Sequence, residues 1–342
     1  IYCHAPRALR KVVSMAKTAS NRESAMRIIL KTITVLSLLA IVLLVGLVAA
    51  FWAPDRSVAD LRERWAPPPS TFVEVAGMQV HIRDEGPRDD PSPIVLLHGT
   101  SASLHTWDGW AAGLKSTRRV VRLDLPGFGL TGPYPDNDYT VGHYAAFMHA
   151  FLDRLGIPRC VLVGNSFGGQ VALVTALAKP ARVDRLVLVD SSGYPLAPSS
   201  IPLGFRIARL PVLNQIARVT LPRRIVEDSI RNVYGDPTRV TPELVDRYFE
   251  LALREGNRQA LAERLKQVTI DAITAQIPGI KVPTLILWGG RDRLIPPEAG
   301  QRFANDIVGS QLHIFPELGH VPHEEDPMQT LAVAKSFLEA KF

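Results

Sequence analysis

Ser166 lies at the centre of a Gly-x-Ser-x-Gly motif that it forms with Gly164 and Gly168. An apolar run rich in β-branched residues ends at Gly164, and a mostly apolar, helix-compatible run follows Gly168, which predicts a buried strand turning sharply into a helix. Small residues are needed on both sides because so tight a turn strains the serine backbone and crowds its neighbours. The turn would present the hydroxyl at its tip, close to the amide end of the helix. Ser166 is therefore predicted to be a nucleophile.

Two further side chains are candidates for activating this hydroxyl. A serine hydroxyl is a poor nucleophile until a base takes its proton, and a histidine base needs a carboxylate to hold its tautomer. Asp292 and His320 each follow a short apolar run that predicts a strand. Ligands bind at the carboxyl ends of parallel strands, so both side chains are expected at that edge of a sheet. Asp190, which follows an earlier strand, is a rival acid, and His323 is a rival base.

The elements that must position these residues alternate between strand and helix. Helical patterns separate most of the strands, as at 141–155, where apolar residues recur at helical spacing. The predicted strands, the first two forming a hairpin, lie at 72–75, 78–82, 94–97, 119–123, 160–163, 185–189, 283–288 and 311–315. This alternation predicts an α/β fold with a mostly parallel sheet and helices on both faces.

With these motifs, the chain resembles the α/β-hydrolase family over about residues 71–330. The resemblance implies a mostly parallel sheet of eight strands, helices on both faces and a helical cap insertion. It also implies a Ser-His-Asp triad, because Asp292 and His320 match the family's acid and base positions. Gly319-His320 followed by Pro322 fits the family pattern better than a base at His323 does.

The same resemblance implies how negative charge on the attacked acyl group would be stabilised. Two backbone N–H groups must already point at the developing oxyanion. The family uses the residue after the nucleophile, here Phe167, and a residue after the His98-Gly99 pair, here Thr100, with Ser101 as the alternate. Only the backbone amide of Thr100 is expected to stabilise the oxyanion, and its side chain is expected to have no role. His98 resembles the family's structural histidine that shapes this loop.

Residues that line the substrate pocket are expected near the same loop. Ser101, Trp107 and Phe128 are the candidates, although aromatic residues at such spacing are more often part of the core. Asp124, which opens a Gly- and Pro-containing loop after a predicted strand, is expected to be structural. The sequence contains no metal-ligand cluster, and the predicted chemistry requires no metal and no organic cofactor.

The N-terminal region has the features of a membrane anchor. Residues 1–31 form a tail with seven basic residues and one acidic residue, which accounts for the whole net charge of +6. The remainder is neutral, which argues against a nucleic-acid-binding surface. Residues 32–53 are 22 residues without a charge, about 33 Å as a helix and enough to cross a bilayer core. The basic flank predicts that the following domain is exported to the periplasmic or extracellular side, with secretion after signal cleavage as the alternative.

Composition also predicts the domain boundaries. Within the basic tail, residues 1–25 are expected to lack fixed structure. The expected domains after the anchor are a stiff Pro-rich spacer at 54–70, a hydrolase core at 71–192 and 281–342, and a helical cap at 193–280. The helical patterns in the cap lie at 207–219, 242–254 and 258–269.

Together these features predict a serine hydrolase that cleaves a small-molecule carboxylic ester, with an apolar acyl group, through an acyl-enzyme. Carbon–carbon hydrolases that act on diketo acid ring-fission products also resemble the motif at 164–169. They usually carry a Gly-rich loop after the His-Gly pair and a Trp after the catalytic His, where this chain has 100–103 and Val321. A different class, a non-catalytic membrane-tethered binding protein of this fold, is opposed by the intact set of Ser166, Asp292 and His320.

Overall fold

The computed structural model describes residues 7–195, 201, 203, 206, 215–267 and 271–339, and it divides into two compact units, Ile1–Trp52 and Ala53–Phe342. The first unit contains helix α1 (Arg7–Ala50). The prediction that residues 1–25 lack fixed structure is wrong from Arg7 onward, because the sequence has no Pro and no Gly between Arg7 and Gly46 to interrupt the helix.

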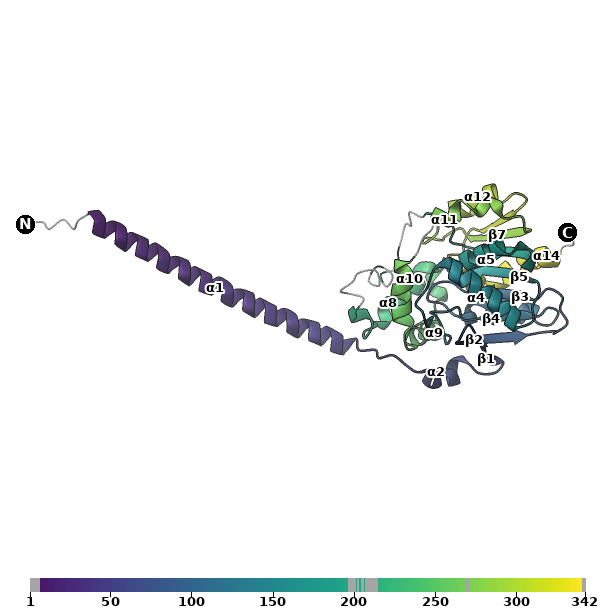
Figure 1. Cartoon of the computed structure of the whole chain (residues 1–342), viewed down its shortest axis with the longest axis horizontal. Helices are drawn as coiled ribbons and strands as arrows, with labels where there is room; N and C mark the ends of the chain where they lie inside the picture. Colours follow the sequence, from purple (N-terminus) through teal and green to yellow (C-terminus); the bar gives the residue numbers. More distant parts are fainter. Residues whose placement is uncertain are drawn as a thin grey trace, which may run out of the picture. The chain divides into compact units, whose positions relative to one another are not determined.

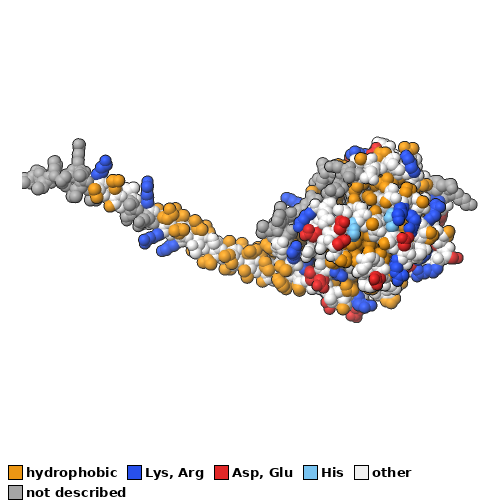
Figure 2. Space-filling model, viewed as in Figure 1, with side chains coloured by type: hydrophobic (Ala, Val, Ile, Leu, Met, Phe, Trp, Pro, Cys, Tyr) orange, Lys and Arg blue, Asp and Glu red, His pale blue; other side chains and the backbone are white. Residues whose placement is uncertain are grey.

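The apolar part of α1 is long enough to cross a membrane. By length and composition the candidate span is Ser24–Ala50, 27 residues, so it begins earlier than the predicted segment 32–53. Its apolar side chains are exposed, and Lys and Arg side chains precede them (Figure 2). The span also ends earlier than predicted, because Ala53 is buried in the second unit.

The second unit is built on one eight-stranded sheet with the order β1-β2-β4-β3-β5-β6-β7-β8. Strand β2 pairs antiparallel with both of its neighbours, and every other pair is parallel. The strands are β1 (Ser70–Val75), β2 (Met78–Glu85), β3 (Ile94–Leu97), β4 (Val120–Leu123), β5 (Cys160–Asn165), β6 (Val183–Val189), β7 (Thr284–Gly289) and β8 (Gln311–Phe315). All eight predicted strands and the mostly parallel sheet are confirmed.

Alternate residues of the central strands pack into two separate cores. In β5, Cys160 and Leu162 belong to a first core, whereas Val161 and Val163 belong to a second core. A strand that is covered on both faces is apolar throughout, which is why these runs do not alternate in the sequence. The α-helices that follow strand β1 outside the cap are, among the described residues, α3 (Asp108–Leu114), α4 (Val141–Arg154), α5 (Phe167–Ala178), α12 (Pro297–Asp306), α13 (Pro322–Glu325) and α14 (Pro327–Glu339).

The two cores correspond to the two layers of helices. Side chains of α4, α5 and α12 enter the first core, and side chains of α3 and α14 enter the second. Helices α4 and α5 lie side by side over the sheet (Figure 1). The predicted helices on both faces are therefore present.

The segment 54–70 is not the stiff spacer that its prolines predict. It contains helix α2 (Val58–Trp65), which begins with a capping box: Ser57 Oγ accepts from the Asp60 N–H at 3.2 Å, and the Asp60 carboxylate accepts from the Ser57 N–H at 3.0 Å. Leu61 of this helix is fully buried. The spacer prediction is wrong because the single buried leucine and the capping box outweigh the polar composition around them.

Backbone hydrogen bonds also tie this segment to the cap. The Ala53 N–H donates to the Val219 carbonyl at 2.9 Å, and the Arg56 N–H donates to the Leu253 carbonyl at 2.7 Å. The Glu255 N–H donates in turn to the Arg56 carbonyl at 2.9 Å. Residues from Ala53 onward therefore belong to the catalytic unit.

The cap is helical and lies between β6 and β7 in the chain. Its described helices are α8 (Arg223–Val233), α9 (Pro242–Ala252), α10 (Asn257–Lys266) and α11 (Asp271–Thr274). Helices α9 and α10 agree with the predicted patterns at 242–254 and 258–269, while most of the pattern at 207–219 lies outside the described residues. Figure 1 shows α8, α9 and α10 grouped together at one side of the sheet.

Candidate active site

Ser166 occupies the sharp turn between strand β5 and helix α5. Its backbone has φ 54° and ψ −118°, which non-glycine residues rarely adopt. Both flanking glycines are sterically required. A Cβ on Gly164 would lie 2.2 Å from the Gly168 carbonyl oxygen, and a Cβ on Gly168 would lie 2.4 Å from the Leu97 carbonyl oxygen. The strained strand–turn–helix that the motif predicts is therefore present.

Asp292 and His320 follow strands β7 and β8 and contact each other. His320 Nδ1 lies 2.6 Å from Asp292 Oδ2, and both side chains are buried. Asp292 Oδ1 accepts from the N–H groups of Leu294 at 2.8 Å and Ile295 at 2.9 Å. Because a carboxylate only accepts, Nδ1 of His320 carries the proton and Nε2 keeps its lone pair. His320 Nε2 hydrogen-bonds to no other described residue, so this imidazole is arranged as a general base.

Asn165, the residue before the nucleophile, ties the histidine loop to the turn. Its Nδ2 donates to the carbonyl oxygens of His320 at 2.9 Å and Val189 at 3.1 Å. The His320 backbone is therefore bonded to the neighbour of Ser166. The sequence analysis missed Asn165, although a polar side chain at the buried end of an apolar strand signals a need for partners.

Glu325 was also missed, and it joins the histidine loop to the cap. One carboxylate oxygen accepts from the N–H groups of Gly319 at 2.8 Å and Gly235 at 2.9 Å, and the other accepts from the Asp236 N–H at 2.8 Å. The His320 N–H donates to the carbonyl of the last residue of cap helix α8 at 2.7 Å. Cap residues therefore fix the backbone of the candidate base.

Asp190, the rival acid, lies beside this pair without replacing Asp292. Polar side-chain atoms of Asp190, Asp292 and His320 all lie within 4.8 Å of one another, which is also spacing that could hold a metal ion. His320 and Asp292 hydrogen-bond to each other, so two of these three side chains have a partner without a metal ion. Asp190 is fully buried and accepts from the Gly289 N–H at 2.9 Å. Burial, followed by the charge of Asp292, raises the pKa of Asp190 well above its usual value, which favours the neutral form of its carboxyl group.

His98 shapes the loop that follows β3. Its Nδ1 lies 2.7 Å from the Gly99 carbonyl oxygen, and its Nε2 accepts from the Leu125 N–H at 2.9 Å. The proton is therefore on Nδ1, and burial lowers the pKa of His98, which keeps the ring neutral. The turn that follows is closed by a hydrogen bond of 3.3 Å from the Ala102 N–H to the Gly99 carbonyl, with Ser101 at φ 60°.

The two predicted oxyanion-hole amides lie next to the nucleophile. A Cβ on Gly99 would be 3.1 Å from the Ser166 Cβ, so the turn that contains Thr100 lies close against the nucleophile. Phe167 begins helix α5, so its N–H has no acceptor within the helix. The Thr100 N–H donates to no other described residue. The assignment of Thr100 and Phe167 to an oxyanion hole stays a prediction, and this arrangement supports it.

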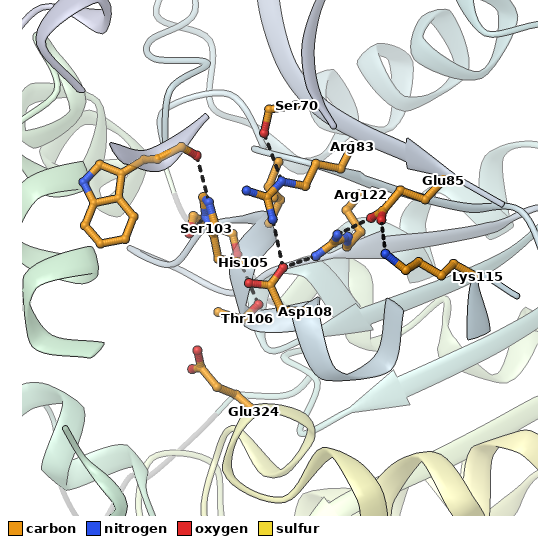
Figure 3. Close-up of polar contacts among 12 residues, drawn as sticks. Ser70, Arg83, Glu85, Ser103, His105, Thr106, Asp108, Lys115, Arg122 and Glu324 are labelled. Carbon is orange, nitrogen blue, oxygen red and sulfur yellow. Dashed lines mark hydrogen bonds and ion pairs between the residues drawn. The ribbon is translucent and has the colours of Figure 1, made fainter. Parts of the chain in front are cut away.

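The far end of the same loop is held by helix α2. His105 Nε2 lies 2.9 Å from the Trp65 carbonyl oxygen and Nδ1 lies 3.0 Å from Ser103 Oγ, as Figure 3 shows. Burial lowers the pKa of His105 to about 3, so the ring is neutral at physiological pH. Nε2–H therefore donates to the carbonyl, and Nδ1 accepts from the Ser103 hydroxyl. A segment expected to be a spacer thus helps to position the loop.

Of the three predicted pocket residues, Ser101 and Phe128 line one cavity. This cavity has a volume of about 40 Å³ and is also lined by Leu251, Ala252 and Leu261 of the cap region. Phe128 is buried in the first core. These two residues therefore lie between the oxyanion loop and the cap, and their contact with substrate stays a prediction.

Trp107 does not line this cavity, and the prediction that it contacts substrate is wrong. It is fully buried in the second core, and its ring centroid lies 5.2 Å from that of Trp110 and 3.9 Å from that of His323. Phe128 packs in the first core, on the opposite face of the sheet. His323 is equally buried, and burial lowers its pKa well below the usual value, so it is a neutral core residue and not the base.

Comparisons with known proteins agree with this fold. A family model described as alpha/beta hydrolase fold matches residues 92–327. The chain is 30% identical over 279 residues to 2-hydroxy-6-oxo-2,4-heptadienoate hydrolase from Pseudomonas putida, and the match covers 79% of this chain and 96% of that protein.

Solved structures are similar as well. A meta-cleavage product hydrolase from Pseudomonas fluorescens has a TM-score of 0.68 at 25% identity, covering 78% of this chain and 97% of that one. A membrane phospholipase A, described as a bacterial virulence factor, has a TM-score of 0.65 at 26% identity, covering 92% of this chain and 98% of that one. With the family model and the relative from Pseudomonas putida, these matches show that the chain belongs to the α/β-hydrolase fold family.

Proposed function

We propose that this hydrolase cleaves a carboxylic ester through an acyl-enzyme formed on Ser166. The observation that carries the proposal is the Asp292–His320 pair. The Nε2 of His320 has no hydrogen-bond partner among the described residues, Ser166 included, and the His320 backbone is bonded through Asn165 to the nucleophile turn. A hydroxyl, a base and a carboxylate that orients the base are the groups that nucleophilic catalysis by serine requires.

In the proposed reaction, the Ser166 oxygen attacks the acyl carbon while His320 Nε2 takes the hydroxyl proton. His320 then gives this proton to the alcohol oxygen as the ester C–O bond breaks, and the acyl group stays on Ser166. Water, deprotonated by the same imidazole, attacks the acyl-enzyme, and the imidazolium returns this proton to the Ser166 oxygen as the acyl–serine bond breaks and the acid is released. Asp292 stabilises the imidazolium in both halves, and the amides of Thr100 and Phe167 donate to the oxyanion.

The proposed substrate is an ester with an apolar acyl group. The cavity beside the oxyanion loop is lined mainly by apolar side chains, among them Phe128, Leu251 and Leu261, together with Asn257 and Arg258. Apolar side chains of this kind favour an acyl chain over a charged group. The similarity to the membrane phospholipase A, which extends over 92% of this chain, supports an acyl ester of a lipid.

A carbon–carbon bond hydrolase is the second candidate. The similarity to 2-hydroxy-6-oxo-2,4-heptadienoate hydrolase and to the meta-cleavage product hydrolase favours it. Val321 follows His320 in this chain, where such enzymes usually carry a Trp, and the loop at 100–103 is not Gly-rich. These two departures favour the ester.

A substrate panel tests the choice. The full-length protein in detergent is expected to hydrolyse p-nitrophenyl esters with kcat/KM rising from acetyl to octanoyl, and to react with a fluorophosphonate probe. A vinylogous diketo acid is expected to remain unconsumed. Turnover of the diketo acid in preference to every ester would overturn the proposal and establish the second candidate. Failure of the probe to label the protein would argue for a binding protein without catalysis.

We also propose that helix α1 anchors the protein in a membrane with the catalytic unit on the exported side. The apolar span Ser24–Ala50 and the basic residues before it support this orientation. Membranes washed with alkaline carbonate should retain the protein, and protease added outside intact cells or spheroplasts should digest the catalytic unit. Recovery of a shortened, soluble protein from the medium or periplasm would instead indicate signal cleavage and secretion.

A further inference from the structure

A buried arginine of the cap contacts both parts of the predicted oxyanion hole. Arg264 Nη2 donates to Thr100 Oγ1 at 2.8 Å. The guanidinium carbon also lies 4.2 Å from the centroid of the Phe167 ring and 5.8 Å from that of Phe128. Only 6% of Arg264 is exposed. One side chain thus contacts the two residues whose amides are assigned to the oxyanion.

Helix α10, which carries Arg264, packs firmly against the catalytic core. Asn257, Ala260, Leu261 and Arg264 follow the i, i+3, i+4, i+7 spacing of one helix face. Ala260 and Leu261 pack against the first core, and Asn257 Nδ2 donates to the Gly129 carbonyl at 2.9 Å. The helix is therefore attached to the catalytic core two turns before the residue that reaches the oxyanion loop.

The turn that carries Thr100 needs such support. Ser101 has φ 60°, a conformation that non-glycine residues rarely adopt, and the turn is closed by a long hydrogen bond of 3.3 Å. A hydrogen bond from a charged guanidinium is stronger than one between neutral groups. The phenyl faces beneath the guanidinium further favour the cation in this buried position.

We propose that Arg264 is a positioning residue of the oxyanion hole, which holds the Thr100 side chain and thereby sets the direction of the Thr100 amide. The hole is then complete only while cap helix α10 is seated on the core. This inference rests on the proposed function. It also gives the Thr100 hydroxyl a role as hydrogen-bond acceptor, although only its amide was expected to matter.

The test compares Arg264→Met, Arg264→Lys, Thr100→Val, Thr100→Ser and the Met/Val double variant in the full-length protein in detergent. Removal of either partner is expected to lower kcat by about 10- to 100-fold, because a donor moved by a fraction of an ångström stabilises the oxyanion less. KM should change by less than about threefold. Thr100→Ser, which keeps the hydroxyl, and Arg264→Lys, which keeps a charged donor, should recover most of the activity. The kcat of the double variant should be no lower than that of Arg264→Met.

Two substrates separate positioning from substrate recognition. A neutral p-nitrophenyl ester and one carrying a free carboxylate should lose the same factor in Arg264→Met. If Arg264→Met lowered kcat only for the carboxylate ester, or if it raised only KM, the inference would be overturned. Arg264 would then be a substrate-binding group. Equal kcat for Thr100→Val and wild type would also overturn it, and this variant decides the case if Arg264→Met does not fold.

The rate of labelling by a fluorophosphonate separates this inference from the proposed function. A wild-type protein that does not react would refute the proposed function, whereas wild type and Thr100→Val reacting at equal rates would refute only the role of Arg264. Arg224→Met is the matched control, because Arg224 is an exposed cap arginine paired with Asp228 within α8. Its labelling rate and kcat should equal those of wild type.

Discussion

Replacement of Ser166 by Ala and of His320 by Ala should each lower kcat on a p-nitrophenyl ester by on the order of 10⁵- to 10⁶-fold. The two residues perform one proton transfer, since the imidazole has a function only when a hydroxyl is present to lose its proton. The double variant should therefore be no slower than either single variant. Steady-state kinetics of the three proteins, each prepared as the full chain in detergent, measure this non-additivity.

The activity that remains in Ser166→Ala measures the part of catalysis that does not depend on the nucleophile. Substrate binding and the oxyanion amides alone should leave a rate about 10³- to 10⁴-fold above that in water. Ser336→Ala is the matched control, because Ser336 is an exposed residue of helix α14 whose hydroxyl donates to the Val333 carbonyl in the same helix. If Ser166→Ala kept full activity, or if the effects of the two single variants multiplied, the acyl-enzyme mechanism would be wrong.

The strands and the nucleophile turn could be predicted from the sequence because their causes are local. A strand covered on both faces must be apolar throughout, so the runs in β3, β5 and β7 stand out. The turn at Ser166 is equally local, since Gly164 and Gly168 are each other's steric neighbours. Asp124 was also interpreted correctly as structural, because it accepts from the N–H groups of Leu104 and Leu130, both at 2.8 Å.

The parts that could not be predicted depend on tertiary contacts. Glu325 looks like an exposed helix residue in the sequence, and only the folded chain brings the amides of Gly235 and Asp236 from the cap and of Gly319 from the histidine loop to its carboxylate. Trp107 lies in sequence near the oxyanion loop, but a turn directs it into the opposite core. Helix α2 was hidden because Pro67, Pro68 and Pro69 dominate the composition of a segment that also carries a capping box and one buried leucine.

The sequence alone also could not decide whether Asp292 or Asp190 is the acid of the triad. Both acids follow a parallel strand, so both are expected at the carboxyl edge of the sheet, and local sequence cannot say which one reaches the histidine. In the folded protein Asp292 bonds to His320 Nδ1 and also accepts two backbone N–H groups. Asp190 instead accepts from the Gly289 N–H, and burial raises its pKa. Two neighbouring carboxyl groups therefore have different partners, and only Asp292 bonds to the histidine.

Asp292→Asn should lower kcat by about 10⁴-fold with little change in KM. The Asn amide donates to His320 Nδ1, which forces the proton onto Nε2 and leaves the ring unable to take the Ser166 proton. Asp190→Asn is the matched isostere and should stay within about tenfold of wild type, since its side-chain oxygen still accepts from the Gly289 N–H. Steady-state kinetics of both variants decide the assignment. Loss of activity in Asp190→Asn with retention in Asp292→Asn would make Asp190 the acid of the triad.

The pH dependence of stability provides an independent readout of the same assignment. Asp190 faces Asp292, Glu325 and His320, and its folded-state pKa is raised, so the folded protein binds a proton that the unfolded chain releases above about pH 4. The contribution of Asp190 to wild-type stability should therefore fall as pH rises from about 4 toward its folded-state pKa. Asn does not titrate, so Asp190→Asn should raise Tm relative to wild type at neutral pH, and the difference should shrink as the pH approaches 4. A Tm difference that is the same at both pH values would mean that Asp190 is charged in the folded protein.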